Sequence, residues 1–285
     1  MPLSYRLEDY ARYRDRVGEA TYLEMTRRTD PARIPEVWDH LREVVDAYGP
    51  PWVLQILTKD ARGVLRRGEP ALRRLRDAGT TITLHLTVTG LAGTPWEPLV
   101  PREGLRGAAP LIDLIGGPDH VKWRYDPIIA TVHDVGRFHR LAGEAAELGI
   151  RRGVINFIAP PGRYRRVDRR VAPLLPGWVD GGPAWLDRYG LAWQQGVALE
   201  LVSLAREAGI SLACCAESAA LAGLVPGLGP AACGDHAWFV ALSGRDLPRA
   251  PRRGSRPGCG CAAYFDLGNY GCWSRCYRCA YCYAG

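Results

Sequence analysis

The sequence predicts an α/β fold: a (β/α) barrel similar to a TIM barrel, complete or partial, followed by a cysteine-rich C-terminal tail. Two observations lead to this prediction. Short apolar runs rich in β-branched residues alternate with longer amphipathic stretches, which is the pattern of parallel strands joined by helices. The repeated units also lack a G-x-G-x-x-G motif after the first strand, which favours a barrel over a dinucleotide-binding sheet.

The expected elements alternate along most of the chain. Strands are expected at residues 20–25, 52–58, 80–88, 120–126, 152–158 and 210–216. Helices are expected at residues 34–47, 61–77, 103–115, 134–148 and 184–208. The first helix follows Asp30-Pro31, a capping residue and a proline. The fourth repeats apolar residues at helical spacing, with Leu141, Ala145 and Leu148. Residues 159–183 interrupt the alternation and predict a long loop that acts as a lid.

Three segments are expected from these elements. Residues 1–20 would form an N-terminal helical extension and residues 21–242 the barrel domain. Residues 243–285 would form a linker, including "RDLPRAPRRGSRPG", and the cysteine-rich tail. The linker is rich in proline, glycine and arginine, so the order of the tail is expected to come from whatever its cysteines bind.

Composition and charge exclude several classes of protein. The chain has 285 residues, 47% of them hydrophobic, and contains no run of eighteen apolar residues, so no membrane partner is expected. The charged N-terminus does not resemble a secretion signal, which predicts a cytoplasmic location where thiols stay reduced. The net charge of +7 indicates an anionic partner. Basic residues do not alternate with aromatic ones in a stripe, however, so a nucleic-acid partner is disfavoured.

Polar residues follow the predicted strands at their carboxyl ends, where barrel enzymes place their active sites. These residues are Arg27, Arg28 and Asp30; Thr58 and Lys59; Thr89; Arg124, Tyr125 and Asp126; Asn156; and Cys215 and Glu217. Pairs of Arg and Asp that only tie loops together would give the same pattern at any single strand. For the whole set, a functional site is the preferred interpretation, because buried charges occur mainly where they are paired or functional. Motifs for a serine nucleophile and for a phosphate-binding loop are missing from the sequence.

The nine cysteines divide into a clustered and a dispersed group. Cys272, Cys276 and Cys279 form C-x3-C-x2-C, and an overlapping frame uses Cys276, Cys279 and Cys282 as C-x2-C-x2-C. Three such thiolates can each bind one iron of a [4Fe–4S] cluster and leave the fourth iron open, whereas zinc prefers two C-x2-C pairs with a spacer between them.

The dispersed group could supply the four thiolates that a closed cluster needs. It consists of Cys215, Cys233, Cys259 and Cys261. A structural zinc site and ordinary buried cysteines are the alternatives. Cys214 points to the other side of its predicted strand from Cys215 and is expected to be a small core residue.

Several motifs, taken in order, resemble one bacterial family. They are "TRRTD", "LTKD", "LTVTG", "WRYDPII", "CAES", "CGDH", "CGC" and the terminal "CAYCYA". The family is catalogued as a domain of unknown function, DUF1848, and described as similar to radical S-adenosylmethionine enzymes. The resemblance covers about residues 24 to 285. It implies a barrel-like enzyme with a [4Fe–4S] cluster that binds S-adenosylmethionine, and a second, auxiliary cluster held by the dispersed cysteines.

The tail departs from the family pattern C-x3-C-x-Y-C-Y-A. Tyr281 precedes Cys282 as the pattern requires, but the x3-x2 spacing selects Cys272, Cys276 and Cys279, with Arg278 in the aromatic position. The tail therefore carries a short insertion and an extra cysteine. The x3-x2 frame is preferred, and Cys276 and Cys279 belong to both frames.

The function implied by the resemblance is reductive cleavage of S-adenosylmethionine and modification of a small, anionic substrate. The cations Arg27, Arg28, Lys59 and Arg124 are expected to hold carboxylates, and Asp126 or Glu217 the ribose hydroxyls or the methionine ammonium. The radical could be 5′-deoxyadenosyl or 3-amino-3-carboxypropyl, and an external donor such as flavodoxin or ferredoxin would supply the electron. The rival interpretations are a zinc-stabilised nucleic-acid-binding protein and an iron–sulfur electron carrier.

Overall fold

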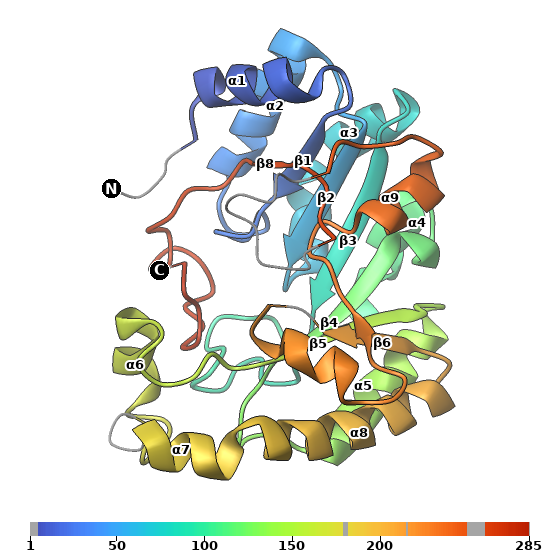
Figure 1. The fold of residues 1–285 in the computed structure, drawn as a ribbon. Helices are drawn as coiled ribbons and strands as arrows, with labels where there is room; N and C mark the ends of the chain where they lie inside the picture. The colour runs from blue at the N-terminus through green and yellow to red at the C-terminus, as the bar shows by residue number, and fades with distance from the viewer. Residues whose placement is uncertain (1–4, 179–181, 215, 250–259, 285) are drawn as a thin grey trace.

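A single parallel sheet of eight strands forms the centre of the molecule, in the order β7-β6-β5-β4-β3-β2-β1-β8 (Figure 1). The structure is a computed structural model that describes residues 5–178, 182–214, 216–249 and 260–284, the side chains of residues 182–184 and 216–219 excepted. The strands are β1 (Tyr22–Met25), β2 (Val53–Thr58), β3 (Thr81–Thr87), β4 (Val121–Ile128), β5 (Arg152–Phe157), β6 (Ser211–Cys214), β7 (Gly229–Pro230) and β8 (Phe265–Asp266). The first six lie where the sequence predicts strands.

Helices connect most of the strands. They are α1 (Leu7–Val17), α2 (Glu36–Tyr48), α3 (Ala61–Asp77), α4 (Ala109–Ile115), α5 (Val135–Glu147), α6 (Arg165–Val171), α7 (Gly182–Tyr189), α8 (Leu191–Glu207) and α9 (His236–Ser243). Short 3-10 helices are η1 (Arg106–Ala108), η2 (Pro118–His120) and η3 (Ala216–Gly223). Asp60 and Asp134 cap α3 and α5 by accepting from the backbone N–H groups of Gly63 and Arg137.

The two faces of the sheet differ in chemistry. The outer face is apolar and packs against the helices; Trp123 of β4, for example, stacks on Phe138 of α5. Residues that alternate with these are polar, including Glu24, Gln55 and Lys122. Trp238 of α9 lies against this inner face, 4.4 Å from the Lys122 ammonium. The inner face is therefore largely polar, and its side chains are buried.

The last strand joins the two ends of the chain. Phe265 and Asp266 of β8 pair in parallel with Leu23 and Glu24 of β1 (Figure 1). Tyr10 and Tyr13 of α1 pack on the Phe265 ring. The segment that follows β7 also hydrogen-bonds to the segment that precedes β8: Ala262 N donates to Gly234 O over 2.8 Å. The largest core cluster contains residues from all three segments expected from the sequence, including Tyr10, Leu54 and Tyr277. The exact segment boundaries stay a prediction.

The prediction of one long loop over residues 159–183 was wrong, because α6 lies within it. Val167 and Val171, four residues apart, are buried in a second apolar cluster together with Trp178 and Ala280. Asp168 of α6 accepts a hydrogen bond from the Trp178 indole over 2.9 Å. The basic residues between the two valines hide this helical spacing in the sequence.

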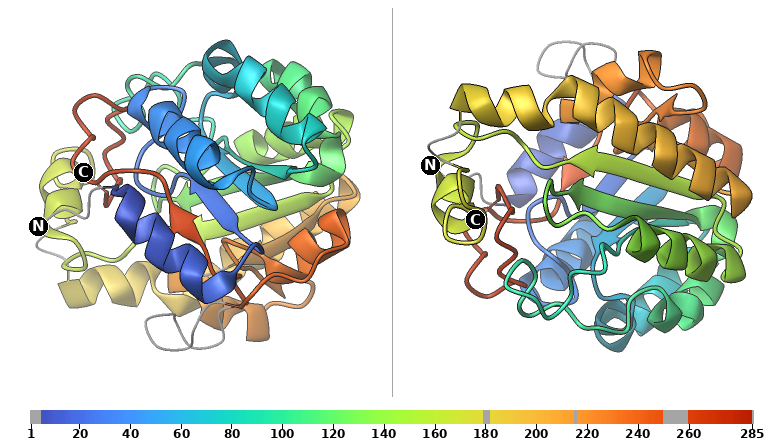
Figure 2. Two further views of the ribbon diagram at one scale, coloured as in Figure 1. Left: turned by 90° about the horizontal axis from the view of Figure 1, so that it is seen from above. Right: turned by 90° about the horizontal axis from the view of Figure 1, so that it is seen from below.

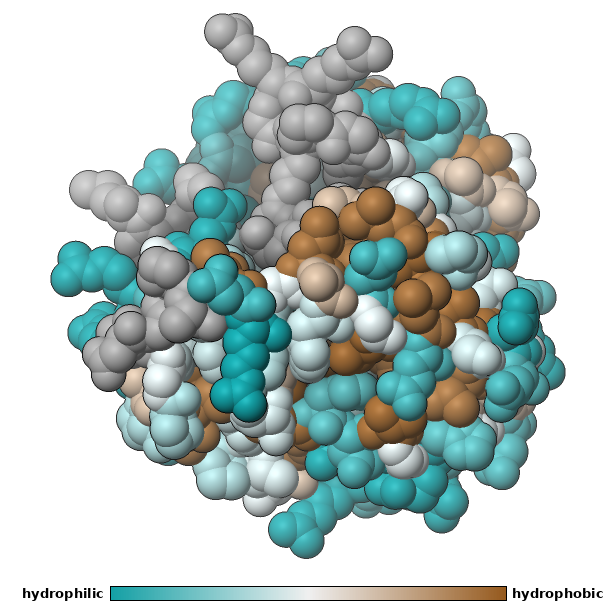
Figure 3. Space-filling view, turned by 60° about the horizontal axis from the view of Figure 1, so that its bottom comes forward, coloured by the Kyte–Doolittle hydropathy of each residue, from teal (hydrophilic) through white to brown (hydrophobic). Residues whose placement is uncertain are grey.

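The single helix predicted over residues 184–208 is in fact two, α7 and α8, separated at Gly190. A Cβ at Gly190 would lie 2.1 Å from the Leu186 carbonyl oxygen, so the turn between them requires glycine. Figure 3 turns the side of these helices forward and shows apolar surface there. Leu191 and Leu199 of α8 are 49% and 44% exposed. Among the described residues, no helix is long and apolar enough to span a membrane.

Candidate functional site

The predicted site residues do meet at one edge of the sheet, because all the strands are parallel and their carboxyl ends point the same way. We call six of them, which the structure describes, the rim: Arg27, Arg28, Asp30, Lys59, Arg124 and Asp126. Each rim side chain has a partner within the protein, described below. Figure 2 shows the C-terminal tail (described residues 260–284, red) at this edge, beside α6.

Asp30 links the ends of β1 and β2. Its carboxylate accepts hydrogen bonds from the Thr58 hydroxyl and the Lys59 backbone N–H, each over 2.7 Å, and from Ala32 N over 2.9 Å. Burial raises the pKa of Asp30 to about 6, although these donors oppose the shift. Asp30 is therefore a buried group that fixes the geometry of two strand ends.

Lys59 forms the centre of a buried network. Its ammonium lies 2.8 Å from Glu97, whose carboxylate also accepts from the Thr89 hydroxyl over 2.8 Å and from the Tyr281 hydroxyl. Burial lowers the pKa of Lys59, but attraction to Glu97 and the nearby Cys279 outweighs it, so the pKa is raised overall. The nearby Asp126 carboxylate also raises the pKa of Lys59. A charged Lys59 thus lies close to a cysteine of the tail.

The other rim cations are also paired. Arg27 binds Glu24 and lies over the Tyr264 ring at 4.0 Å, and Arg28 lies 3.5 Å from Asp266. Arg124 and Asp126 bind one another, and the Asn156 amide lies 3.5 Å from Asp126. The sequence predicts that these cations hold ligand carboxylates. Because each cation already binds an acid of the protein, a ligand carboxylate would have to displace or join that acid.

Several contacts attach the tail to segments that follow the strands, beside the rim. The Tyr277 hydroxyl donates to Asp60 over 2.9 Å, and Ala280 N donates to the Trp96 carbonyl over 3.0 Å. Arg170 of α6 donates to the Cys282 carbonyl. Together with the Tyr281–Glu97 hydrogen bond, these contacts hold the tail across the ends of β2, β3 and β5.

Three tail thiols lie near one another. Burial raises the pKa of Cys276 to about 12, and the charges of Asp30 and Cys282 add to this effect. Burial also raises the pKa of Cys279, which both Cys276 and Cys282 influence further. Cys272 is in a different setting, where its sulfur accepts from Arg275 over 3.6 Å. Within the described part of the chain, no three Cys, His, Asp or Glu side chains already surround one point as metal ligands.

The dispersed cysteines are only partly described. Cys233 and Cys261 lie on paired segments, since Gly234 N donates to the Cys261 sulfur over 3.5 Å and Asp235 forms an antiparallel β-bridge with Cys261. Cys215 and Cys259 lie outside the described residues, as does the side chain of Glu217. Cys214 is buried in the main core, as predicted.

Sequence reasoning missed the acidic partners and the inner face of the sheet. Glu24, Glu97 and Asp266 pair with the rim, while Gln55, Thr83 and His85 are buried on β2 and β3. The available signal was a polar residue at alternating positions in four otherwise apolar strands. That pattern indicates a polar inner face.

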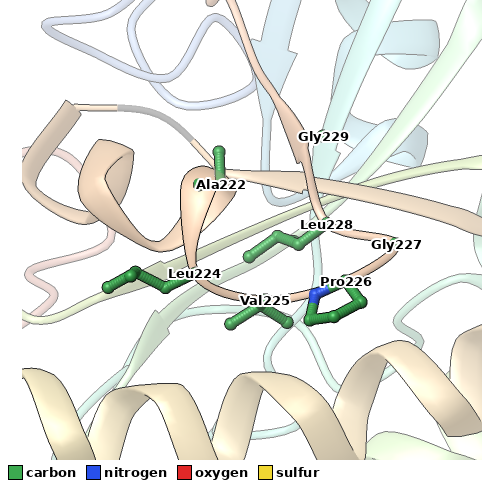
Figure 4. Close-up of a pocket in the computed structure, with 8 residues that line it drawn as sticks. Ala222, Leu224, Val225, Pro226, Gly227, Leu228 and Gly229 are labelled. Atoms are coloured by element: carbon green, nitrogen blue, oxygen red, sulfur yellow. The ribbon is translucent and has the colours of Figure 1, made fainter.

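A pocket of about 450 Å³ lies elsewhere, lined by residues 222–229 of the loop between η3 and β7 (Figure 4). Its lining consists of alanine, glycine, leucine, valine and proline. It contains no predicted site residue and no ionisable group that could take part in catalysis. This pocket therefore offers no catalytic group.

Weak structural matches connect the chain to several solved proteins. The carboxyl transferase domain of Rhizobium etli pyruvate carboxylase is 14% identical, with a TM-score of 0.36, over 78% of this chain and 32% of that one. An L-ribulose 3-epimerase is 12% identical, with a TM-score of 0.25, over 79% and 57%. Dihydropteroate synthase from Thermus thermophilus is 17% identical, with a TM-score of 0.25, over 78% and 79%.

These similarities support no statement about activity, and the chain spans only part of the first two proteins. No curated protein matches. A family model, by contrast, matches residues 51–284, which include Lys59, Arg124, Asp126 and every tail cysteine. Arg27, Arg28 and Asp30 precede the matched stretch. Because the match covers most of the sequence, the chain belongs to the family described as a domain of unknown function, DUF1848.

Proposed function

We propose that this protein is a radical S-adenosylmethionine enzyme whose tail cysteines hold a [4Fe–4S] cluster at the rim. The observation that carries the proposal is the position of the tail thiols. Cys276, Cys279 and Cys282 lie near enough to influence one another electrostatically, and Cys279 lies beside Lys59 at the carboxyl ends of the strands. A simple electron carrier would not need a sheet of this size with a polar inner face.

The residues present suit such a cluster. Three cysteine thiols close together in sequence are the donors that iron–sulfur clusters use, and the sequence between Cys276 and Cys282 contains no carboxylate or imidazole. Cys276 and Cys279 belong to both frames, and Cys282 and Cys272 are the two candidates for the third ligand. When bound, the cluster and S-adenosylmethionine would supply one-electron cleavage of a sulfonium C–S bond.

The chain's own residues would position the ligands and exclude water. Lys59 and Arg124 would offer charge to a ligand carboxylate, with Glu97 and Asp126 as the partners that such a carboxylate replaces or joins. The apolar cluster of α6, Trp178 and Ala280 borders the tail and would keep water away. A small-molecule substrate and a flavodoxin or ferredoxin as electron donor complete the proposal.

We also propose that the sheet closes into a barrel. Two hydrogen bonds support closure between the segments that follow β7 and precede β8: Ala262 N to Gly234 O at 2.8 Å and His236 N to Gly260 O at 3.3 Å. Closure would surround the inner face on all sides, which is the arrangement that a radical reaction needs.

Purification without oxygen tests the proposal. A brown protein that absorbs near ~400 nm and contains about four irons, or about eight with an auxiliary cluster, is expected. Incubation with S-adenosylmethionine and reductant should then release a small product that identifies the cleaved bond. A colourless protein with stoichiometric zinc would overturn the proposal in favour of the zinc-stabilised alternative.

Single substitutions identify the ligands. Cys276→Ala and Cys279→Ala should each lose about four irons, the content of one cluster, whereas the matched control Cys214→Ala should keep them because Cys214 lies in the core. Cys282→Ala and Cys272→Ala then separate the two frames. Loss of iron in Cys272→Ala but not in Cys282→Ala would show that the x3-x2 frame is the correct one.

A further inference from the structure

Three uncharged polar side chains form a layer on the inner face of β2 and β3. Gln55 and Thr83 are direct partners in the register of the two strands, and His85 follows Thr83 by two residues on the same face. Gln55 and Thr83 are 0% exposed and His85 is 1% exposed. We call these three residues the polar layer.

Hydrogen-bond partners are missing throughout the polar layer. Both amide atoms of Gln55, the Thr83 hydroxyl and both ring nitrogens of His85 are buried without a partner among the described residues. The nearest ring to His85 is the Trp238 indole, 5.8 Å away between centroids. Buried polar groups in native proteins are almost always hydrogen-bonded, because an unmade bond costs free energy. Something other than these protein atoms must therefore complete the layer.

The surroundings of the layer specify an uncharged partner. The pKa of His85 lies well below its usual value because the ring is buried and lies near Lys122, Arg124 and Arg27, so the imidazole is neutral. Those three cations already bind acids: Lys122 lies 2.6 Å from Asp235, and the two arginines bind Asp126 and Glu24. A charged group at the layer would have to compete with these acids for a cation, whereas an uncharged group would not.

The donors and acceptors of the layer specify the chemistry of that partner. The Gln55 amide presents a carbonyl acceptor beside an NH₂ donor, and the neutral His85 ring adds one donor and one acceptor. A carboxamide or a lactam carries the complementary donor and acceptor side by side. A polyol would satisfy the same atoms with less geometric specificity.

We propose that the polar layer binds an uncharged carboxamide or lactam group of a small molecule. The layer continues along β4, through Lys122, Arg124 and Asp126, to the rim, so a ligand bound there would extend toward the tail cysteines. This inference names a substrate class for the proposed enzyme and rests on that function only for the reaction. Binding itself needs neither cluster nor electron.

Calorimetric titration of the full chain with a matched pair of probes tests the proposal. Nicotinamide carries a neutral carboxamide and nicotinate a carboxylate on the same ring, and uracil adds a lactam. Saturable binding of nicotinamide or uracil is expected, with nicotinate weaker by about tenfold or more. Equal binding of nicotinate, or no saturable binding of either neutral probe, would overturn the proposal.

Variants locate the binding. Gln55→Leu and Thr83→Val should each weaken binding of the neutral probe by about tenfold or more, because a hydrogen-bond partner is lost. Thr81→Val, the same change at the amino end of β3, should leave binding unchanged. Unchanged binding in Gln55→Leu would show that any binding occurs elsewhere.

The thermal midpoint without ligand gives an independent readout. Gln55→Leu, Gln55→Met and Thr83→Val should raise it, because each removes a buried polar group that lacks a partner. A lowered midpoint in all three would show that water already completes the layer, and would overturn the proposal. Since these measurements use protein with or without iron, they fail independently of the cluster assays.

Discussion

The rim and the polar layer lie close together on one sheet, yet they differ in how they are completed. At the rim, Lys59 binds Glu97 and Arg124 binds Asp126, so the charges are matched within the protein. In the layer, Gln55, Thr83 and His85 are uncharged and have no partner among the described residues. The difference is that the charges of the rim are neutralised within the protein, whereas the layer lacks partners and is where we propose that a ligand binds.

The largest effect is expected when the buried ion pair of Lys59 at the rim is broken. Lys59→Met leaves Glu97, whose side chain is 1% exposed, as an unpaired buried carboxylate. We expect the free energy of unfolding to fall by about 3–5 kcal/mol in urea denaturation. The control is Arg62→Met, at an ion pair whose side chains are 52% and 50% exposed, which should cost about 0–1 kcal/mol. Equal losses of stability in the two variants would show that burial of the Lys59–Glu97 pair does not add to the cost of breaking it.

A smaller effect is expected where the tail meets the end of β2. Tyr277→Phe removes the hydrogen bond to Asp60 while keeping the buried ring, which is 2% exposed. Stability should fall by about 1.5–3 kcal/mol, as for other hydrogen bonds to charged groups. Tyr164→Phe, which preserves the stacking on Tyr283, serves as the control and should change little. A tail that resists protease equally in both variants would contradict the role of this bond.

The pH dependence of stability tests the protonation of Glu24, the buried acid that binds Arg27. Burial raises the pKa of Glu24 from its ordinary value of 4.5 to about 7, although Arg27 opposes the shift. The folded state therefore binds more protons than the unfolded state between those values, and stability should fall as pH rises from about 4.5 to 7. This group contributes at most about 1.4 kcal/mol per pH unit.

Comparing variants isolates that contribution. Glu24→Gln should flatten the decline in urea denaturation between about pH 5 and pH 7, whatever its effect on stability at a single pH. Glu103→Gln removes a carboxylate that is half exposed and should leave the slope as in the native chain. An identical slope in Glu24→Gln and the native chain would show that Glu24 titrates normally.

The smallest effect is expected at the outside of the tail. Arg275 binds Glu36, but their side chains are 57% and 40% exposed, so water already solvates both charges. Arg275→Ala should therefore leave the unfolding transition unchanged at physiological salt. A clear loss of stability would mean that exposed contacts, and not Tyr277 and Tyr281, hold the tail at the rim.

The sequence predicts the helices and strands of this fold better than it predicts which residues pair in the folded chain. β1 to β6 are apolar runs long enough to be recognised, whereas β7 and β8 have two residues each and carry no periodic signal. The rim residues were predicted because strands that run in parallel end at the same edge. Their partners were not, since Glu97 lies 38 residues from Lys59 and 184 from Tyr281, distances that only the folded chain brings together.

The pairing of β8 with β1 has a consequence for synthesis on the ribosome. Asp266 contacts Arg27 across 239 residues, so β1 leaves the ribosome well before its neighbour in the sheet is made. During that time one edge of β1 presents unpaired N–H and C=O groups, which other strands could bind. The same late segment carries the thiols of the tail, so protection of the sheet edge and arrival of the proposed cluster ligands coincide in time.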